Sequence, residues 1–151
     1  MDKRELAYLA GIFDAEGSIL IQKKKPGFFN KTVKYILGVT ITNTRVELVL
    51  LAREQFGGNI VGPVNQKETQ KPFYRWKLEG AKARDFLKEM EPYLIIKRDL
   101  LPLAYEFQDR IESYHRKPID PIEMAARDEI YQRLRSLKNI NWNLLQDGSA
   151  E

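Results

Sequence analysis

The sequence predicts an α+β fold with the element order αββαββα and additional C-terminal helices. Three observations predict it: a helical pattern precedes every strand-like segment, four segments alternate apolar and polar residues, and the second half has helical spacing. With 151 residues, 43% of them hydrophobic, the chain is long enough to bury one core. We expect a single domain over residues 1–143 and a loose C-terminal tail over residues 144–151.

The first helix is expected from Arg4 to Ala15, where no proline or β-branched run interrupts the chain. One face is apolar and a second face is made of small residues around Gly11. An interior glycine costs up to about 1 kcal/mol relative to alanine, so Gly11 suggests the close approach of another backbone. Gly17 fits the position after a helix end, where a left-handed residue is common.

Glu16 is the last side chain before this stop, beside the free carbonyl groups and the negative end of the helix dipole. A carboxylate is disfavoured there, and a bound cation would reverse the penalty. Glu16 and the neighbouring carbonyl oxygens therefore form half of a candidate magnesium site. Taken alone, the position also fits a solvent-exposed glutamate at a frayed helix end.

Two strand pairs follow, separated by a helix. Alternation predicts a strand over Ser18–Lys25, whose end turns through residues 23–27, and a clean strand over Lys31–Thr42. Thr44 and Glu47 form a capping box that opens a helix through residue 56, which glycines 57 and 58 end. The second pair is expected over residues 59–66 and 72–78.

The second half of the chain is helical in pattern. Asp99 is a candidate N-cap that places Pro102 in a first helical turn, and Asp120, with Pro121 and Glu123, marks another helix start. The expected helices are Gly80–Met90, Tyr93–Tyr114, and one from Pro121 to about Lys138.

Composition narrows the classes of protein. The absence of cysteine and the single histidine, His115, exclude disulfides and make a zinc or copper site implausible, so a catalytic metal should be a hard cation bound by oxygen. No apolar run is long enough for a membrane span, and no signal peptide is evident. We expect an intracellular protein with no membrane partner, cytoplasmic in a prokaryote or organellar.

The charge of the chain is concentrated in its middle. Residues 18–82 hold twelve Lys or Arg and four Glu, a formal charge of +8, whereas the flanking segments are both acidic. A local basic excess of this kind favours a polyanion partner, most simply nucleic acid. A solvated lysine-rich surface is the alternative on composition alone.

The segment from Leu9 to Gly17, LAGIFDAEG, resembles the signature motif of the LAGLIDADG homing endonucleases. Six of its nine positions are identical, and the three departures replace apolar by apolar residues or aspartate by glutamate. The element order also matches the family layout over roughly the first 115 residues. The resemblance implies a saddle-shaped four-stranded antiparallel sheet that binds double-stranded DNA.

The single motif implies a homodimer in which two motif helices pack together, with Ala7, Ala10, Gly11 and Asp14 at the interface. A twofold enzyme implies a long pseudo-palindromic target. The implied activity is that of an intron-encoded endonuclease making double-strand breaks by metal-dependent phosphodiester hydrolysis. Glu16 and the carbonyl of Gly17 would bind Mg²⁺ in this interpretation.

Three further catalytic residues are carried over from the family by position. Asn43 ends the second strand, where the family often has a polar side chain, although a turn residue is an equal interpretation. Arg45 lies near a basic position that supports the attacking water, and it also fits surface charge. Lys97 matches a recurrent active-site lysine that stabilises the transition state.

The strand faces opposite the expected core provide the candidate DNA contacts. Amides and arginine read base edges, whereas lysine mainly neutralises phosphates. Each strand of an ordinary antiparallel sheet also has a polar face, so single residues remain open. The candidates are Ser18, Leu20, Gln22, Lys24, Thr32, Lys34, Ile36, Thr40, Thr42, Asn65, Lys67, Phe73, Arg75 and Lys77.

The alternative function on the same fold is an intron RNA maturase, with intron RNA as partner, or a non-cleaving DNA-binding protein. The retained Glu16 favours cleavage, because a pure binder does not need a carboxylate aimed at phosphates.

Overall fold

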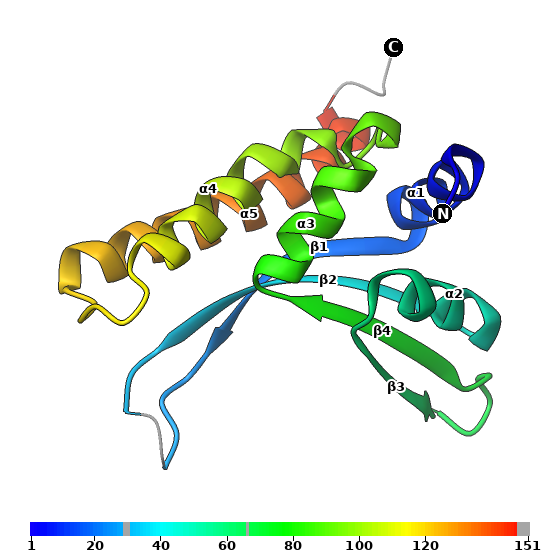
Figure 1. Cartoon of the computed structure of the whole chain (residues 1–151), viewed down its shortest axis with the longest axis horizontal. Helices are drawn as coiled ribbons and strands as arrows, with labels where there is room; N and C mark the ends of the chain where they lie inside the picture. The colour runs from blue at the N-terminus through cyan, green and yellow to red at the C-terminus, as the bar shows by residue number, and fades with distance from the viewer. Residues whose placement is uncertain (29–30, 66, 148–151) are drawn as a thin grey trace.

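The computed structural model describes residues 1–28, 31–65 and 67–147, and it has the expected αββαββα order (Figure 1). Two short 3-10 helices, η1 (Glu91–Tyr93) and η2 (Arg98–Leu100), precede the additional helices. The main elements are α1 (Lys3–Glu16), β1 (Gly17–Lys24), β2 (Lys34–Asn43), α2 (Val46–Phe56), β3 (Asn59–Val64), β4 (Phe73–Glu79), α3 (Ala81–Met90), α4 (Leu101–Ser113) and α5 (Pro121–Asp147).

The four strands form one antiparallel sheet in the order β1-β2-β4-β3. β1 follows α1 without a connecting loop and pairs with β2 from Gly17 opposite Ile41 to Lys24 opposite Lys34. The strand ends at Lys24, one residue before the predicted end, so Lys23 and Lys24 belong to the strand and precede the turn. Helices cover one face, and the two arms of the sheet diverge on the other, so that the helix-free face is concave (Figure 1).

The core lies between the sheet and the helices. The period of two along β2 is confirmed, because Tyr35, Leu37, Val39 and Ile41 are all buried. Phe86 of α3 packs edge-on against Phe13, Phe56 and Trp76 at ring-centroid distances of 5.1, 4.9 and 5.2 Å. Edge-to-face aromatic packing adds to the stabilisation from burial.

α2 begins at Val46 without the expected capping box. Arg45 occupies the N-cap position, and no side chain caps the helix. The helix begins one residue later than the predicted cap Thr44 requires. Asn43 Oδ1 accepts the Arg45 N–H at 2.8 Å, and Glu47 pairs with the Arg45 guanidinium at 3.3 Å. Gly57 ends the helix with a φ of 74°, a conformation that favours glycine, as the sequence predicts.

The prediction of one helix over Tyr93–Tyr114 is wrong at its start. Residues 94–97 are not helical, Asp99 does not cap α4, and α4 begins at Leu101 with Pro102 in its first turn. The physical reason is a distant carboxylate, Asp14, which holds the backbone N–H groups of residues 95–97.

α5 starts where the sequence predicts, since the Glu123 N–H donates to Asp120 Oδ1 at 2.7 Å. It continues past Lys138 to Asp147, and residues 148–151 of the predicted tail lie outside the described residues. Within the described part of the chain, every helix is too short or too polar to span a bilayer.

Candidate active site and nucleic-acid interface

α1 delivers an exposed carboxylate to the edge of the concave face. Its start is fixed by a capping box in which Asp2 and Glu5 each accept the other's backbone N–H at 2.9 Å. Its last residue, Glu16, is exposed, and Glu16 Oε2 accepts a hydrogen bond from Asn43 Nδ2. The negative helix end and the carboxylate together favour a cation at this point.

Gly17 makes the direct passage from helix to strand sterically feasible. Its backbone is extended (φ −82°, ψ 172°), so the expected left-handed conformation is not present. Glycine is required instead because a Cβ would lie 2.6 Å from the Phe13 carbonyl oxygen and collide with Cδ2 of the Phe13 ring. The buried Phe13 ring thereby limits which residue can follow Glu16 at the junction between α1 and β1.

Asp14 fixes the loop that carries Lys97. Its carboxylate accepts the N–H groups of Ile95 and Ile96 at 2.8 Å and of Lys97 at 2.9 Å. Burial acts to raise the pKa of Asp14, but the three backbone donors outweigh it, and the pKa lies below its usual value. Asp14 is therefore an ionised anchor at neutral pH.

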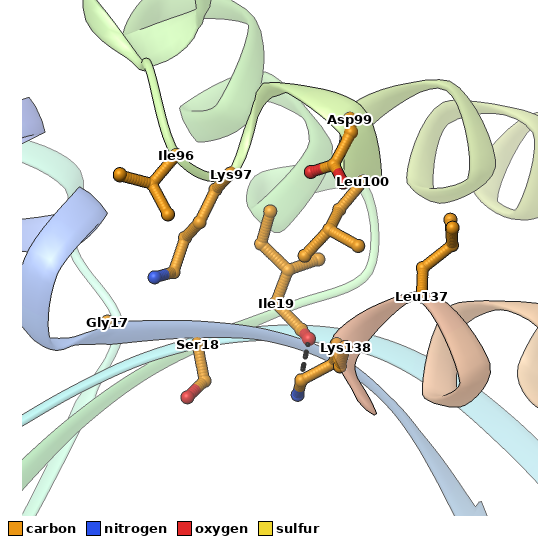
Figure 2. Close-up of a pocket in the computed structure, with 9 residues that line it drawn as sticks. All are labelled: Gly17, Ser18, Ile19, Ile96, Lys97, Asp99, Leu100, Leu137 and Lys138. Atoms are coloured by element: carbon orange, nitrogen blue, oxygen red, sulfur yellow. Dashed lines mark hydrogen bonds between the residues drawn. The ribbon is translucent and has the colours of Figure 1, made fainter. Parts of the chain in front are cut away.

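Lys97 points from this loop toward β1, beside Gly17 and Ser18 (Figure 2). Its Nζ donates to the Asp14 carbonyl oxygen at 2.7 Å, and it lines a pocket of about 170 Å³. Burial lowers the pKa of Lys97, the Asp14 carboxylate opposes that shift, and the nearby Lys138 adds to it. A desolvated cation of this kind interacts strongly with an approaching phosphate.

Asn43 connects two of the predicted catalytic residues, whereas Arg45 points away from them. The Asn43 amide donates to Glu16 and accepts the Arg45 backbone N–H, which fixes the orientation of the amide. The Arg45 side chain is 74% exposed and pairs with Glu47. The structure therefore brings Glu16, Asn43 and Lys97 to the end of α1, and it places the Arg45 guanidinium in solvent.

The concave face, defined as the sheet face opposite the helices, carries most of the candidate DNA contacts. Several of them bond to each other: Lys77 Nζ donates to Gln22 at 3.0 Å and pairs with Glu79 at 2.9 Å, and Arg75 Nε donates to Thr42 at 3.3 Å. On this face lie Ser18, Leu20, Gln22, Lys24, Lys34, Ile36, Thr40, Thr42, Phe73, Arg75 and Lys77, while Thr32, Asn65 and Lys67 are exposed in the adjoining connections.

Solved structures similar to this chain are homing endonucleases. The archaeal intron-encoded homing endonuclease I-Vdi141I, complexed with DNA, has a TM-score of 0.70 and 19% identity, over 90% of this chain and 85% of that one. I-CvuI with its target has a TM-score of 0.72 and 17% identity, over 89% and 82%. The LAGLIDADG homing endonuclease I-GzeII with its DNA target has a TM-score of 0.62 and 17% identity, over 86% and 43%.

The chain has the LAGLIDADG homing endonuclease fold. The motif that the sequence contains, LAGIFDAEG, occupies the helix end expected of that fold, with its acidic residue next to the sheet. No protein-family model and no curated protein matches the sequence.

The end of α1 offers two oxygen donors to a divalent cation. They are the Glu16 carboxylate and the Gly17 carbonyl group, which are the hard oxygen donors that Mg²⁺ prefers. In the portion of the chain that the structure describes, no three acidic, histidine or cysteine side chains come close enough to bind a metal together. The donor chemistry therefore fits a divalent cation, provided that other molecules complete the coordination.

The exposed face of α1 differs from the face that the sequence predicts for the dimer. Ala7 and Gly11 are exposed, and a Cβ on Gly11 would meet no atom within 4 Å. Ala10 is fully buried in the core, and Asp14 is bonded to the loop before α4, so neither side chain is available to a second subunit. Ala15 completes the exposed small-residue stripe in their place.

Sequence reasoning missed residues that reach the site from β3 and α5. Asn59 and Val61 pair with Lys77 and Arg75, so they share the concave face. Alternation within the expected strand suggested that these two residues share a face. The sequence alone does not reveal which residues of β4 pair with them. Lys138, whose Nζ donates to the Ile19 carbonyl oxygen at 3.0 Å, left no local signal because α5 reaches β1 only in the folded chain.

Proposed function

We propose that the protein is a site-specific homing endonuclease that makes double-strand breaks in a long pseudo-palindromic DNA target. The observation that carries the proposal is the position of Glu16, which Asn43 orients at the end of α1, next to Lys97 and the concave face. A carboxylate, a half-buried cation and a basic sheet in this arrangement suit the cleavage of a phosphodiester. The DNA complexes of I-Vdi141I and I-CvuI support duplex DNA as the substrate.

The active form is a homodimer that pairs two α1 helices along their exposed stripe. Ala7, Gly11 and Ala15 allow the close approach of a second helix. Beside the end of α1, Ile95 and Ile96 are 81% and 64% exposed, although they are large and apolar. In the dimer, both isoleucine side chains would be buried against the second subunit. This burial explains why the loop that Asp14 holds directs them away from their own core.

The size of the chain also supports an active form made of two copies of it. The match covers less than half of I-GzeII, as one subunit of a two-part assembly would. Twofold symmetry would bring the two copies of Glu16 together at the axis, so that each half-site of a pseudo-palindrome meets the same concave face.

In the cleavage reaction, Glu16 and the Gly17 carbonyl of each subunit would hold Mg²⁺, which would lower the pKa of water and neutralise charge that develops on the phosphate. Asn43 keeps the Glu16 carboxylate in one orientation. Lys97 places a positive charge beside the reacting phosphate, and Arg45 is free to swing from Glu47 toward the water around it. No side chain of the site is placed as a general base, so solvent accepts the proton.

The test is cleavage of a randomised duplex library, followed by kinetics on the selected target. The wild type should cleave with Mg²⁺ and not with EDTA. Glu16→Gln should bind the selected duplex within about threefold of the wild type and lose at least about a hundredfold in cleavage rate, because the carboxylate acts in the chemical step. Glu54→Gln, which removes an exposed charge from α2, is the matched control and should cleave normally.

Full activity of Glu16→Gln would overturn the metal assignment. Binding of the wild type to DNA without cleavage of any selected duplex would contradict the endonuclease and favour a DNA-binding regulator. Tight binding of intron RNA in place of DNA would favour the maturase.

A further inference from the structure

The outer half of the β1–β2 hairpin is attached to α5 by a cluster of four side chains. Asp128 Oδ1 accepts hydrogen bonds from Lys23 Nζ at 2.9 Å and from the Tyr35 hydroxyl at 2.6 Å. The rings of Tyr35 and Tyr131 lie 5.8 Å apart, and Lys23 Nζ is 5.6 Å from the centre of each. We call these four residues the hairpin anchor.

In the hairpin anchor, which lies at the margin of the core, Asp128 satisfies the hydrogen-bond donors of Lys23 and Tyr35. Tyr35 is only 5% exposed, so its hydroxyl depends on Asp128 as a hydrogen-bond acceptor. The bonds from Tyr35 and then Lys23 lower the pKa of Asp128, which is therefore ionised at neutral pH. Replacing Asp128 would leave both a buried hydroxyl and an ammonium group without their partner.

The register of the sheet connects the anchor to the concave face. Lys23 and Tyr35 are directly paired, and the pairs on either side are Gln22 with Ile36 and Lys24 with Lys34. Because successive residues of a strand point to opposite faces, these flanking pairs face the concave side. The backbone that carries these four candidate DNA contacts is thus the backbone that α5 holds.

A second contact shows that α5 follows β1 instead of crossing it. Lys138 Nζ bonds to the Ile19 carbonyl oxygen near the start of the strand (Figure 2). From Asp128 to Lys138 the helix rises about 15 Å, and from Lys23 back to Ile19 the strand spans about 13 Å. The two lengths match, so an antiparallel helix supports the edge strand at both ends.

We propose that Asp128 and Lys23 are positioning residues that set the angle of the hairpin and thereby the base preference at the outer part of each half-site. The effect on base preference rests on the proposed DNA-binding function, whereas the anchoring itself does not. α5 lies outside the concave face, so it acts through Gln22, Lys24 and Lys34 without contacting the bases.

The first experiment measures anchoring in the free protein by hydrogen–deuterium exchange. In Asp128→Ala, amides of residues 22–24 and 34–36 should exchange about tenfold faster, because a charge-assisted hydrogen bond and a buried hydroxyl bond are lost. Amides of residues 39–41, nearer the sheet centre, should change little. Lys23→Met should speed the exchange of the same amides by a smaller factor. Lys23→Arg should exchange almost as slowly as the wild type.

Glu129→Gln is the matched control, since Glu129 is the next residue of α5, is exposed and lies outside the anchor. It should leave hairpin exchange unchanged. Equal exchange in wild type and Asp128→Ala, or an equal rise throughout the sheet, would overturn the anchor as a local device.

The second experiment compares the duplexes that each protein selects from a randomised library. Asp128→Ala should lose preference about tenfold at the outer base pairs and keep it at the central ones, while Glu129→Gln matches the wild type. Unchanged outer preferences despite faster hairpin exchange would overturn the positioning role. Failure of the wild type to select any duplex would contradict the proposed function, and hydrogen exchange would still decide whether α5 anchors the hairpin.

Discussion

At the scale of single residues, Asp14 anchors a loop within its own chain. Its three backbone bonds join the motif helix to a segment more than 80 residues away, and that segment carries Lys97. The side chain is 9% exposed, so its bonds are shielded from water. Such a group stabilises the fold only while it is ionised.

Asp14→Asn should lower the free energy of unfolding by about 2–3 kcal/mol at pH 7, because an amide oxygen replaces a charged acceptor of three N–H groups. The pKa of Asp14 is lowered in the folded state, so its contribution is present above the unfolded-state pKa of about 3.9 and is lost as the pH falls through the folded-state value. Urea unfolding from pH 3 to 7 measures it. The stability of wild type and variant should converge at acid pH, and a constant difference would contradict this role.

The sequence could not reveal the partners of Asp14. Its short-range context, a stripe of small residues, suggested a subunit interface, and only the folded chain brings residues 95–97 to it. Glu16 was a candidate because of the motif, since a carboxylate at a helix end by itself also fits an exposed glutamate. Asn43 was a candidate only through the family resemblance, with a turn residue as the equal alternative, and the structure adds its bond to Glu16.

At the scale of elements, local patterns determined most helices and strands. The period of two along β2 and the glycine after α2 made those elements predictable. Long-range bonds decided where prediction failed: Asp14 delays the start of α4, and the Phe13 ring, not a left-handed residue, requires glycine at position 17. Packing of α1 against the core divides the helix into a buried face with Ala10 and an exposed face with Gly11.

The outer face of α1 gives a prediction for the dimer. Gly11→Leu should leave the monomer folded, because a Cβ there meets nothing and leucine is the better helix former. It should nevertheless convert the proposed dimer to the 17.6 kDa monomer, because a leucine side chain would separate two closely packed helices. Sedimentation velocity measures the change, with thermal unfolding as a check on the fold.

Ser136→Leu is the control for this substitution, since it adds a leucine to an exposed position of α5. It should sediment as the wild type does. A Gly11→Leu protein that remains dimeric would remove α1 from the interface, and a monomeric wild type would contradict the homodimer itself.

At the scale of the whole molecule, the charge division along the sequence becomes a division between the sheet with α2 and the remaining helices. Residues 18–82, with a formal charge of +8, form the sheet and α2, and the chain on both sides of this segment is acidic. The element order and this asymmetry were both predictable, because each depends on sequence-local counts. Which strands pair, and therefore which lysines lie together, needed the fold.

This division predicts how DNA affinity responds to salt. Each lysine that neutralises a phosphate releases a condensed counterion, so the slope of log affinity against log salt concentration should fall by about one per chain when such a lysine is removed. Lys34→Gln, on the concave face beside Lys24, should show this change. Arg133→Gln removes an equal charge from the exposed surface of α5 and should not. Binding titrations of the selected duplex at KCl concentrations between about 50 and 200 mM give the slope for each of the two variants. Equal slopes for the two variants would mean that net charge, and not the concave face, governs binding.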